Sequence, residues 1–295
     1  MDKQTKRYLL WAFVLAWILQ AAAIVCARDG QAQLFRLCLL ISMYAPFTAT
    51  LLAKIPLRDM GWRPRLRGKL RYVLAAWFAW AILGALGAAL YYWLFPSSFD
   101  PAGTYYLEQI GEAGQQQMEA QGLSLQTLFL LQAVSALTYA PLVNTLAALG
   151  EEVGWRGALY PRLKERFGSV RGRLLGGVIW GVWHWPVMIL AGYNYGTAYW
   201  GAPVLGPLVF CLGCIALGTL FDALYEKTGC IWVPALAHGA YNSSAGILTL
   251  WMAPAAIDKT ILGPAPIGLI AGLPLFLLAA WVLLRGRRAS SAQSR

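Results

Sequence analysis

The chain has 295 residues, of which 59% are hydrophobic and 13% are charged, and its formal net charge is +11. Soluble domains carry about 25% charged residues, so this composition excludes an ordinary soluble domain and indicates an integral membrane protein. The basic residues are spread over several short segments that flank apolar stretches. This distribution predicts contact with a lipid bilayer and its anionic lipids, and it argues against a compact basic domain that binds nucleic acid.

Eight apolar stretches approach the roughly 20 residues that a helix needs to cross a bilayer. They lie at about 8–27, 34–53, 72–94, 126–149, 174–191, 203–225, 230–250 and 262–284. Arg36 and Pro46 interrupt the second stretch, and the fifth is short. No linker divides the chain. The sequence therefore predicts one all-α polytopic membrane domain over 1–295, with about eight transmembrane helices.

The basic residues also predict an orientation. Of the 24 Lys and Arg residues, 21 lie before the first stretch, after the last, or in alternate connections between stretches. The connection at about 95–125 instead has four acidic residues and no Lys or Arg. Because basic connections stay in the cytoplasm, the sequence predicts that both termini are cytoplasmic, N-in and C-in.

The first polar motif joins Glu151, Glu152 and Arg156 at the edge of an apolar stretch. Charges at the centre of a membrane helix cost about 2.5–3.5 kcal/mol each, which suggests a use for them. Glu152 and Arg156 are four residues apart and can pair on one helix face. Glu151 points about 100° away and is expected to face the bundle interior. The alternative is that all three are interfacial charges at a helix end.

Two further motifs each contain one of the two histidines of the chain. Trp180 and His184 lie one turn apart, and Pro186 predicts a kink beside the histidine because it removes a backbone hydrogen bond. His238 and Asn242 also share a helix face. The alternatives are an interfacial aromatic belt with a structural histidine and an interhelical hydrogen-bond clamp.

Together these residues are suited to the attack of an activated water on an amide carbonyl. Glu151 is the candidate general base, and an imidazole can orient the water or carry a proton. His238 and Asn242 offer donors where an oxyanion would develop. A zinc site is the alternative, with Glu151, His184 and His238 as ligands, because helical spacing does not test ligand geometry.

The three motifs resemble those of the CPBP family of intramembrane endopeptidases, which includes CAAX proteases and proteins of the bacteriocin-processing and abortive-infectivity type. The family pattern of two Glu, three variable residues and Arg matches Glu151, Glu152 and Arg156; its Phe, three residues and His matches Trp180 and His184; its His, three residues and Asn matches His238 and Asn242. Trp180 thus stands where the family has Phe. The resemblance covers about 150–245.

The resemblance implies an intramembrane peptidase in which Glu151 and His184 activate water, His238 and Asn242 stabilise the oxyanion, and Glu152, Arg156 and Trp180 support the site. It also implies a membrane-associated peptide or protein substrate and a prokaryotic plasma membrane. The charge topology places the first motif near the cytoplasmic side, so we expect a cavity open to the cytoplasm. Family members are described both as metalloproteases and as glutamate-dependent proteases. The favoured interpretation requires no cofactor, with zinc as the alternative.

Two other functions remain as alternatives at the level of the sequence. One is a scaffold or bacteriocin-immunity protein that keeps the family shell without hydrolysis. The other is a proton-coupled transporter that uses the buried carboxylates and histidines as a relay. Such a transporter should show inverted repeats or paired broken helices, and neither is visible in the sequence.

Overall fold

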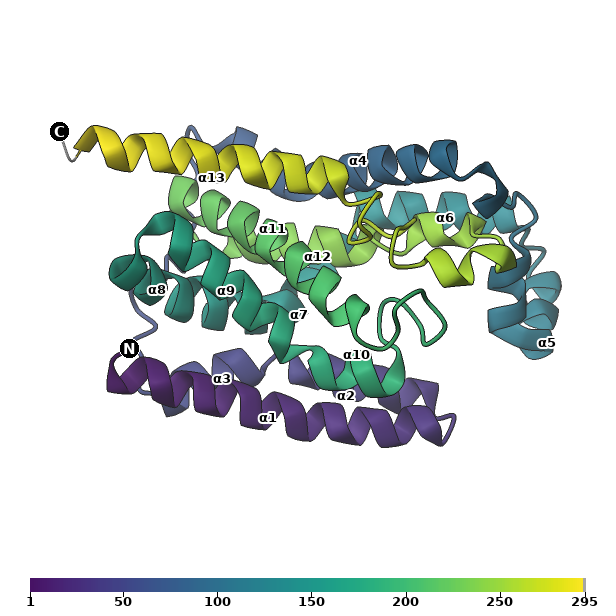
Figure 1. Ribbon diagram of the computed structural model, residues 1–295, viewed down its shortest axis with the longest axis horizontal. Helices are drawn as coiled ribbons and strands as arrows, with labels where there is room; N and C mark the ends of the chain where they lie inside the picture. Colours follow the sequence, from purple (N-terminus) through teal and green to yellow (C-terminus); the bar gives the residue numbers. More distant parts are fainter. Residues whose placement is uncertain (294–295) are drawn as a thin grey trace.

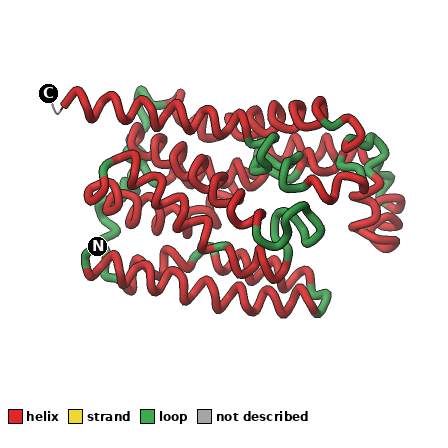
Figure 2. The backbone as a smooth tube through the Cα atoms, viewed as in Figure 1, coloured by secondary structure: helices red, strands yellow, loops and turns green. Residues whose placement is uncertain are grey.

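The computed structural model describes residues 1–293. Over these residues all the regular elements are helices, and the only β contact is an isolated bridge between Phe99 and Met252. Figure 1 shows the helices running mostly parallel or antiparallel to one long axis, and Figure 2 shows how short most of the connecting loops are. The predicted all-α polytopic class is confirmed.

The elements follow one another in this order: α1 (Lys3–Arg28), α2 (Ala32–Ser42), α3 (Ala45–Leu52), α4 (Leu70–Leu94), η1 (Pro96–Ser98), α5 (Thr104–Ala120), α6 (Leu125–Leu137), α7 (Ala140–Glu152), η2 (Val153–Leu159), α8 (Tyr160–Phe167), α9 (Ser169–Trp183), α10 (Trp185–Ala191), α11 (Leu205–Thr228), α12 (Trp232–Ser244), η3 (Ile247–Trp251), η4 (Pro254–Lys259) and α13 (Leu273–Gln293). The element η2 is a π-helix, and η1, η3 and η4 are 3₁₀ helices.

Fewer segments than the expected eight are long, unbroken apolar helices. By length and composition, four spans in the described chain could cross a membrane: α1, α2 together with α3, α4, and α11. Two bent pairs, α5–α6 at 87° and α9–α10 at 40°, raise the number to six. The sequence predicted a kink at the α9–α10 break, through Pro186, but it did not reveal the break between α5 and α6.

Prolines and glycines explain where the other expected stretches are interrupted. The stretch at 126–149 divides between α6 and α7, and Pro141 occupies the first turn of α7, where its missing N–H costs nothing. The stretch at 262–284 begins with consecutive turns that contain Gly263 and Pro264, and its helix starts only at Leu273. A proline inside a helix removes a hydrogen bond, so these segments bend or stop.

The charged ends of the molecule are separated as the sequence predicts. In Figure 1 the N-terminus, α8 and the C-terminal end of α13 lie at one end, whereas α5, from the acidic 95–125 connection, lies at the other. The basic connections and the acidic connection are thus at opposite ends of the bundle. The assignment of the basic end to the cytoplasm stays a prediction.

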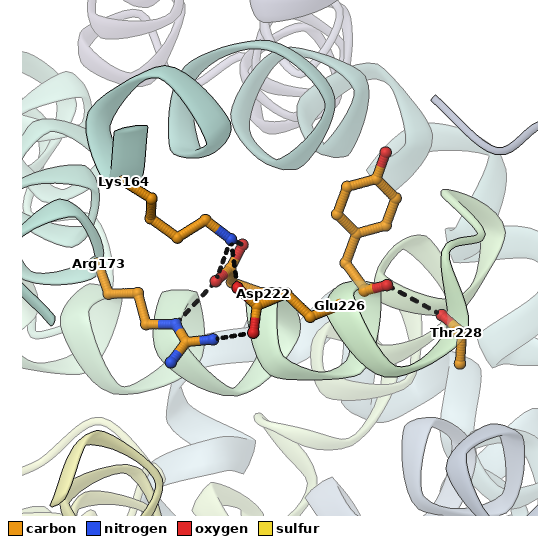
Figure 3. A network of polar contacts seen from close by, with 6 residues as sticks. Lys164, Arg173, Asp222, Glu226 and Thr228 are labelled. Carbon is orange, nitrogen blue, oxygen red and sulfur yellow. Dashed lines mark hydrogen bonds and ion pairs between the residues drawn. The ribbon is translucent and has the colours of Figure 1, made fainter. Parts of the chain in front are cut away.

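Two of the basic residues counted as loop charges are in fact buried. Arg156 is fully buried in η2, and Arg173 is buried in α9. Arg173 and Lys164 both bond to Asp222 and Glu226 of α11, at distances of 2.6–2.8 Å (Figure 3). This ionic network joins α8, α9 and α11 at the basic end of the bundle.

Glycines bring together the helices that carry the polar motifs. A Cβ at Gly239 of α12 would lie 2.6 Å from the backbone nitrogen of Thr145 in α7. A Cβ at Gly177 of α9 would collide with Ile215 of α11. Small residues let helix backbones approach closely in this way. As a result, the first and third motifs lie on two helices in direct contact.

Candidate active site

The first motif lies where α7 changes into the π-helix η2. Glu151 and Glu152 are the last residues of α7, and Arg156 lies inside η2. Gly154 faces Pro46 and the hydroxyl of Tyr8, and a Cβ there would come within 2.3–2.7 Å of both, so the wider turn packs against α1 and α3. π-Helical turns are rare and often mark functional sites. Periodicity in the sequence did not reveal this one.

Glu152 joins two of the three motifs. Its Oε1 accepts a hydrogen bond from Nη1 of Arg156 at 2.9 Å and lies 2.8 Å from Nδ1 of His238. Glu152 and Arg156 are completely buried. The predicted pairing of these two side chains is confirmed, while the contact with His238 was not foreseen. Neither residue lines the cavity described below, so this pair lies behind the surface of the site.

Aromatic rings surround the Arg156 guanidinium. Its carbon lies 4.6 Å from the ring centroid of Trp180, 4.8 Å from that of Tyr160 and 5.1 Å from that of Phe221. Among the described residues, its Nε and Nη2 have no hydrogen-bond partner, and neither does Oε2 of Glu152. Cation–π attraction contributes about 2 kcal/mol or more at desolvated positions, which offsets part of the cost of burying this charge.

Two tryptophans hold the Glu151 carboxylate by one oxygen. Oε2 accepts hydrogen bonds from Nε1 of Trp180 at 2.7 Å and from Nε1 of Trp155 at 3.1 Å. No hydrogen bond joins Oε1 to any residue whose side chain the structure describes, 1–286. Glu151 is 3% exposed and lines the cavity, as expected for a carboxylate that faces the bundle interior. Sequence reasoning missed Trp155, although its i+4 spacing from Glu151 was visible.

Trp180 also fixes His184. The Nδ1 of His184 lies 3.0 Å from the backbone carbonyl oxygen of Trp180. Because a carbonyl only accepts hydrogen bonds, Nδ1 carries the proton and the neutral ring presents a lone pair on Nε2. Trp183 and Phe210 pack edge-on against the imidazole, with centroids 4.6 and 4.8 Å away. A phenylalanine at position 180 could still accept the hydrogen bond from Nδ1 of His184 through its backbone carbonyl. It has no side-chain N–H, so it could not donate a hydrogen bond to Glu151.

The predicted kink at the second motif is present. The helix breaks at His184, between α9 and α10, and bends by 40°. The carbonyl oxygen of Trp183 accepts hydrogen bonds from Nε2 of Gln20 at 2.8 Å and from Nε1 of Trp17 at 3.2 Å. Oε1 of Gln20 in turn accepts from the N–H of Val187 at 3.3 Å. Gln20 of α1 therefore stabilises the break, a role that sequence spacing could not indicate.

The third motif presents one buried and one accessible side chain. His238 is 4% exposed, and its Nδ1 contacts Glu152, so its Nε2 is the ring atom left for other partners. Asn242 lies one turn further along α12 and is exposed. Its side chain has no hydrogen bond within the described chain. Both residues line the same cavity as Glu151 and His184.

The cavity has a volume of about 540 Å³ and brings five of the seven expected site residues to one surface. These are Glu151, Trp180, His184, His238 and Asn242. This volume is in the range of about 300–1,000 Å³ that is typical of ligand pockets. The three motifs, separate in the sequence, thus form a single site.

The cavity extends away from the basic end of the molecule. Arg36, Asn194 and Thr249 line it and belong to α2, the α10–α11 connection and η3, which lie in the half away from the N-terminus and α8 (Figure 1). The N-in orientation places the basic end of the bundle in the cytoplasm, but the cavity extends toward the other end. The two predictions, an N-in chain and a cavity open to the cytoplasm, therefore disagree. They differ because loop charges indicate the side of the membrane, whereas helix packing decides where the cavity lies.

The residues named for the zinc alternative do not form a metal-binding group. No three His, Cys, Asp or Glu side chains within 1–293 are placed to hold a metal ion together. Nδ1 of His184 and Nδ1 of His238 face a backbone carbonyl and Glu152, which leaves the Nε2 atom of each ring available. Outer partners of this kind are also usual for metal-ligating histidines, so these contacts do not decide the question. The interpretation without a cofactor and the zinc alternative both stay predictions.

Comparison with known proteins identifies the segment that holds the site. Residues 127–244 match the family model described as type II CAAX prenyl endopeptidase, Rce1-like. The chain is also similar to CAAX prenyl protease 2 of Methanococcus maripaludis, with 24% identity over 144 residues, or 48% of each chain. The match thus spans about half the length of this curated relative. The family-model match covers the part of the chain in which the three motifs lie.

Proposed function

We propose that this chain, which belongs to the CAAX protease family, is an intramembrane endopeptidase that hydrolyses a peptide bond of a membrane-associated protein or peptide. The observation that carries the proposal is the state of Glu151. Two indole N–H groups fix one oxygen of its carboxylate, its other oxygen has no partner within 1–286, and the residue lines a cavity shared with His184. A general base needs this combination of fixed position and free lone pairs.

The reaction begins with a water molecule between Glu151 and His184. Glu151 takes a proton from this water as the water oxygen attacks the carbonyl carbon of the scissile bond. Nε2 of His184 accepts the second water hydrogen and orients the attack. When the tetrahedral intermediate collapses, the C–N bond breaks and the proton held by Glu151 passes to the leaving nitrogen. The products are a new carboxyl terminus and a new amino terminus.

His238 and Asn242 lie on the side of the cavity formed by α12 and stabilise the oxyanion. The amide nitrogen of Asn242 donates a hydrogen bond in any protonation state of the protein. Nε2 of His238 donates only when its ring is an imidazolium, because Nδ1 already faces Glu152. Removing a single oxyanion donor typically lowers kcat by about 10²–10³-fold.

The test compares membranes that contain the wild type with membranes that contain Glu151→Gln. A proteomic search for new peptide termini should find cleavage products with the wild type that are absent with the variant. Glu165→Gln is the matched control, since Glu165 is an exposed acid on α8 away from the cavity. Cleavage by Glu151→Gln at the wild-type level would contradict the proposal. A phenotype that survives loss of both Glu151 and His184 would instead support a non-catalytic scaffold.

Two finer points of the proposal have direct tests. Purified protein offered the same peptide with and without an S-prenyl group shows whether prenylation matters, and a chelator tests for a metal requirement, which we do not expect. For the orientation, we propose that the basic end is cytoplasmic. A cysteine placed at Asn194, with the five native cysteines replaced, should then react with a membrane-impermeant maleimide in intact cells. Labelling only after the cells are opened would reverse this orientation.

A further inference from the structure

Tyr193 is a half-buried residue of the cavity that the proposed reaction does not use. It lies two residues after the end of α10, in the connection to α11. Its ring lies beside that of His184, with the two centroids 6.4 Å apart and the two planes within 2° of parallel. No hydrogen bond joins the Tyr193 hydroxyl to any residue of 1–286, whose side chains the structure describes. A polar group next to the proposed water site is therefore left for another partner.

Hydrogen bonds hold the backbone on both sides of Tyr193. Its own N–H donates to the carbonyl oxygen of Val187 in α10 at 3.3 Å. Two residues further on, the hydroxyl of Tyr195 donates to the carbonyl oxygen of Ile267 at 2.9 Å. The carbonyl oxygen of Tyr195 accepts a hydrogen bond from the hydroxyl of Thr260 at 2.7 Å. Although Tyr193 belongs to a connection, its ring is thus presented to the cavity from a fixed segment.

Tyr193 also lies within electrostatic reach of the proposed base. Burial raises the pKa of the Tyr193 hydroxyl to about 12, and the negative charge of Glu151 adds to this rise. The phenol therefore keeps its proton near neutral pH and is available as a hydrogen-bond donor. Glu151 and Nε2 of His184 both act as acceptors in the proposed reaction, so a neutral donor beside them does not compete for their role.

The water of the proposed reaction leaves one position for such a donor. Its two hydrogens go to Glu151 and to Nε2 of His184, and one of its two lone pairs attacks the carbonyl carbon. The other lone pair is free to accept a hydrogen bond, and buried waters typically make about three, within a range of 2–4. A donor at this position fixes the direction of the attacking lone pair, and such orientation lowers the barrier of a reaction.

The other neutral N–H and O–H donors of the cavity wall are mostly engaged or assigned. The indole of Trp180 donates to Glu151. Four more side chains donate to backbone carbonyls, namely Gln20, Ser42, Trp183 and Thr249. His238 and Asn242 lie on the oxyanion side. Asn194 and Tyr241 also line the cavity, but Tyr193 is the better candidate because its ring lies beside His184.

We propose that Tyr193 is a further catalytic residue, whose hydroxyl donates a hydrogen bond to the attacking water between Glu151 and His184. This inference rests on the proposed peptidase function and adds a third group that holds its water. Tyr193 transfers no proton: Glu151 still takes the proton of the water and passes it to the leaving nitrogen. Tyr193 lies outside the three motifs, so their spacing in the sequence did not indicate it.

The experiment uses the full chain in nanodiscs and a quenched fluorescent peptide with three residues after an S-prenylated cysteine. Tyr193→Phe removes only the hydroxyl and keeps a ring beside His184. It should lower kcat about tenfold, as expected for one lost hydrogen bond, and leave KM unchanged. Tyr193→Leu also removes the ring and should lose at least as much. Wild-type kcat in Tyr193→Phe together with a low kcat in Tyr193→Leu would overturn the proposal, because ring packing alone would then explain the residue.

Tyr139→Phe is the matched control, because Tyr139 is 63% exposed and does not line the cavity. It should leave kcat and KM unchanged. A rise in KM at constant kcat in Tyr193→Phe would also overturn the proposal, since it would indicate contact with the substrate rather than with the water.

An experimental density map of the wild type gives a readout that does not depend on activity. It should show a water within hydrogen-bond distance of the Tyr193 hydroxyl, Oε1 of Glu151 and Nε2 of His184. A water bonded to Glu151 and His184 but not to Tyr193 would reject the inference. If the wild type does not cleave the peptide, the proposed function fails for this substrate type, and the map still decides the contact. If the wild type cleaves and Tyr193→Phe has the same kcat, only the inference about Tyr193 fails.

Discussion

The protein buries two clusters of charge, and they differ in how completely they are neutralised. In the ionic network of Figure 3, two cations and two carboxylates face one another, and every carboxylate oxygen of Asp222 and Glu226 has a partner. In the site cluster, Glu152 has one bonded oxygen and one oxygen without a partner in the described part of the chain, where Arg156 likewise has two nitrogens without partners. The carboxylate oxygens of the ionic network are thus all bonded, whereas the site cluster keeps buried polar atoms without partners among the described residues.

This difference separates a structural role from a functional one. A buried ion pair contributes to stability only if its remaining donors and acceptors are satisfied. The ionic network meets that condition and joins three helices. The site cluster does not, and it lies directly behind the cavity, against His238 and Trp180. We interpret the unsatisfied atoms as a cost that the fold carries in order to place an acid and an imidazole together.

The largest effect is expected from Glu152→Gln, which removes the charge that neutralises Arg156 and contacts His238. Loss of one partner of a buried pair costs about 3–5 kcal/mol of unfolding free energy. The variant should also lose about 10²-fold or more in kcat, because Nδ1 of His238 would lose the carboxylate that orients the ring toward the oxyanion. Thermal unfolding and kcat measured on the same purified sample test both. A stable variant with full kcat would show that this cluster is not part of the site.

Asp222→Asn should separate stability from activity. It leaves Lys164 and Arg173 with one carboxylate between them, so unfolding free energy should fall by about 3–5 kcal/mol. The kcat of the molecules that remain folded should be unchanged, because the ionic network lies outside the cavity. Glu226→Gln is the matched control: its side chain is 45% exposed, so the loss should be about 1 kcal/mol or less. A fall in kcat with Asp222→Asn would indicate coupling between the two clusters.

A smaller effect is expected from removing the indole donors to Glu151. Trp180→Phe and Trp155→Phe each delete one hydrogen bond while an aromatic ring remains, and each should lower kcat about tenfold with little change in KM. The double variant should lose more than either single one, because both indoles hold the same oxygen. Trp77→Phe, at an indole that bonds only to the carbonyl of Leu137, is the control. Equal changes in KM and kcat would point to general loosening of the fold.

The sequence by itself determined the all-α membrane class, the pairing of Glu152 with Arg156, the inward position of Glu151 and the kink beside His184. These features are local: they follow from apolar length, from the 3.6-residue period and from the missing N–H of Pro186. The separation of the basic and acidic ends also follows from the order of charges along the chain.

Only the tertiary structure decided how the motifs combine. The contact of Glu152 with His238, the hydrogen bond from the Trp180 indole to Glu151 and the support of the α9–α10 break by Gln20 join residues far apart in the chain. The shorter helices and the direction of the cavity likewise depend on where glycines and prolines let segments pack or turn. The periodicity of the sequence indicates which residues share a helix face, but the packing between helices determines which other residues that face contacts.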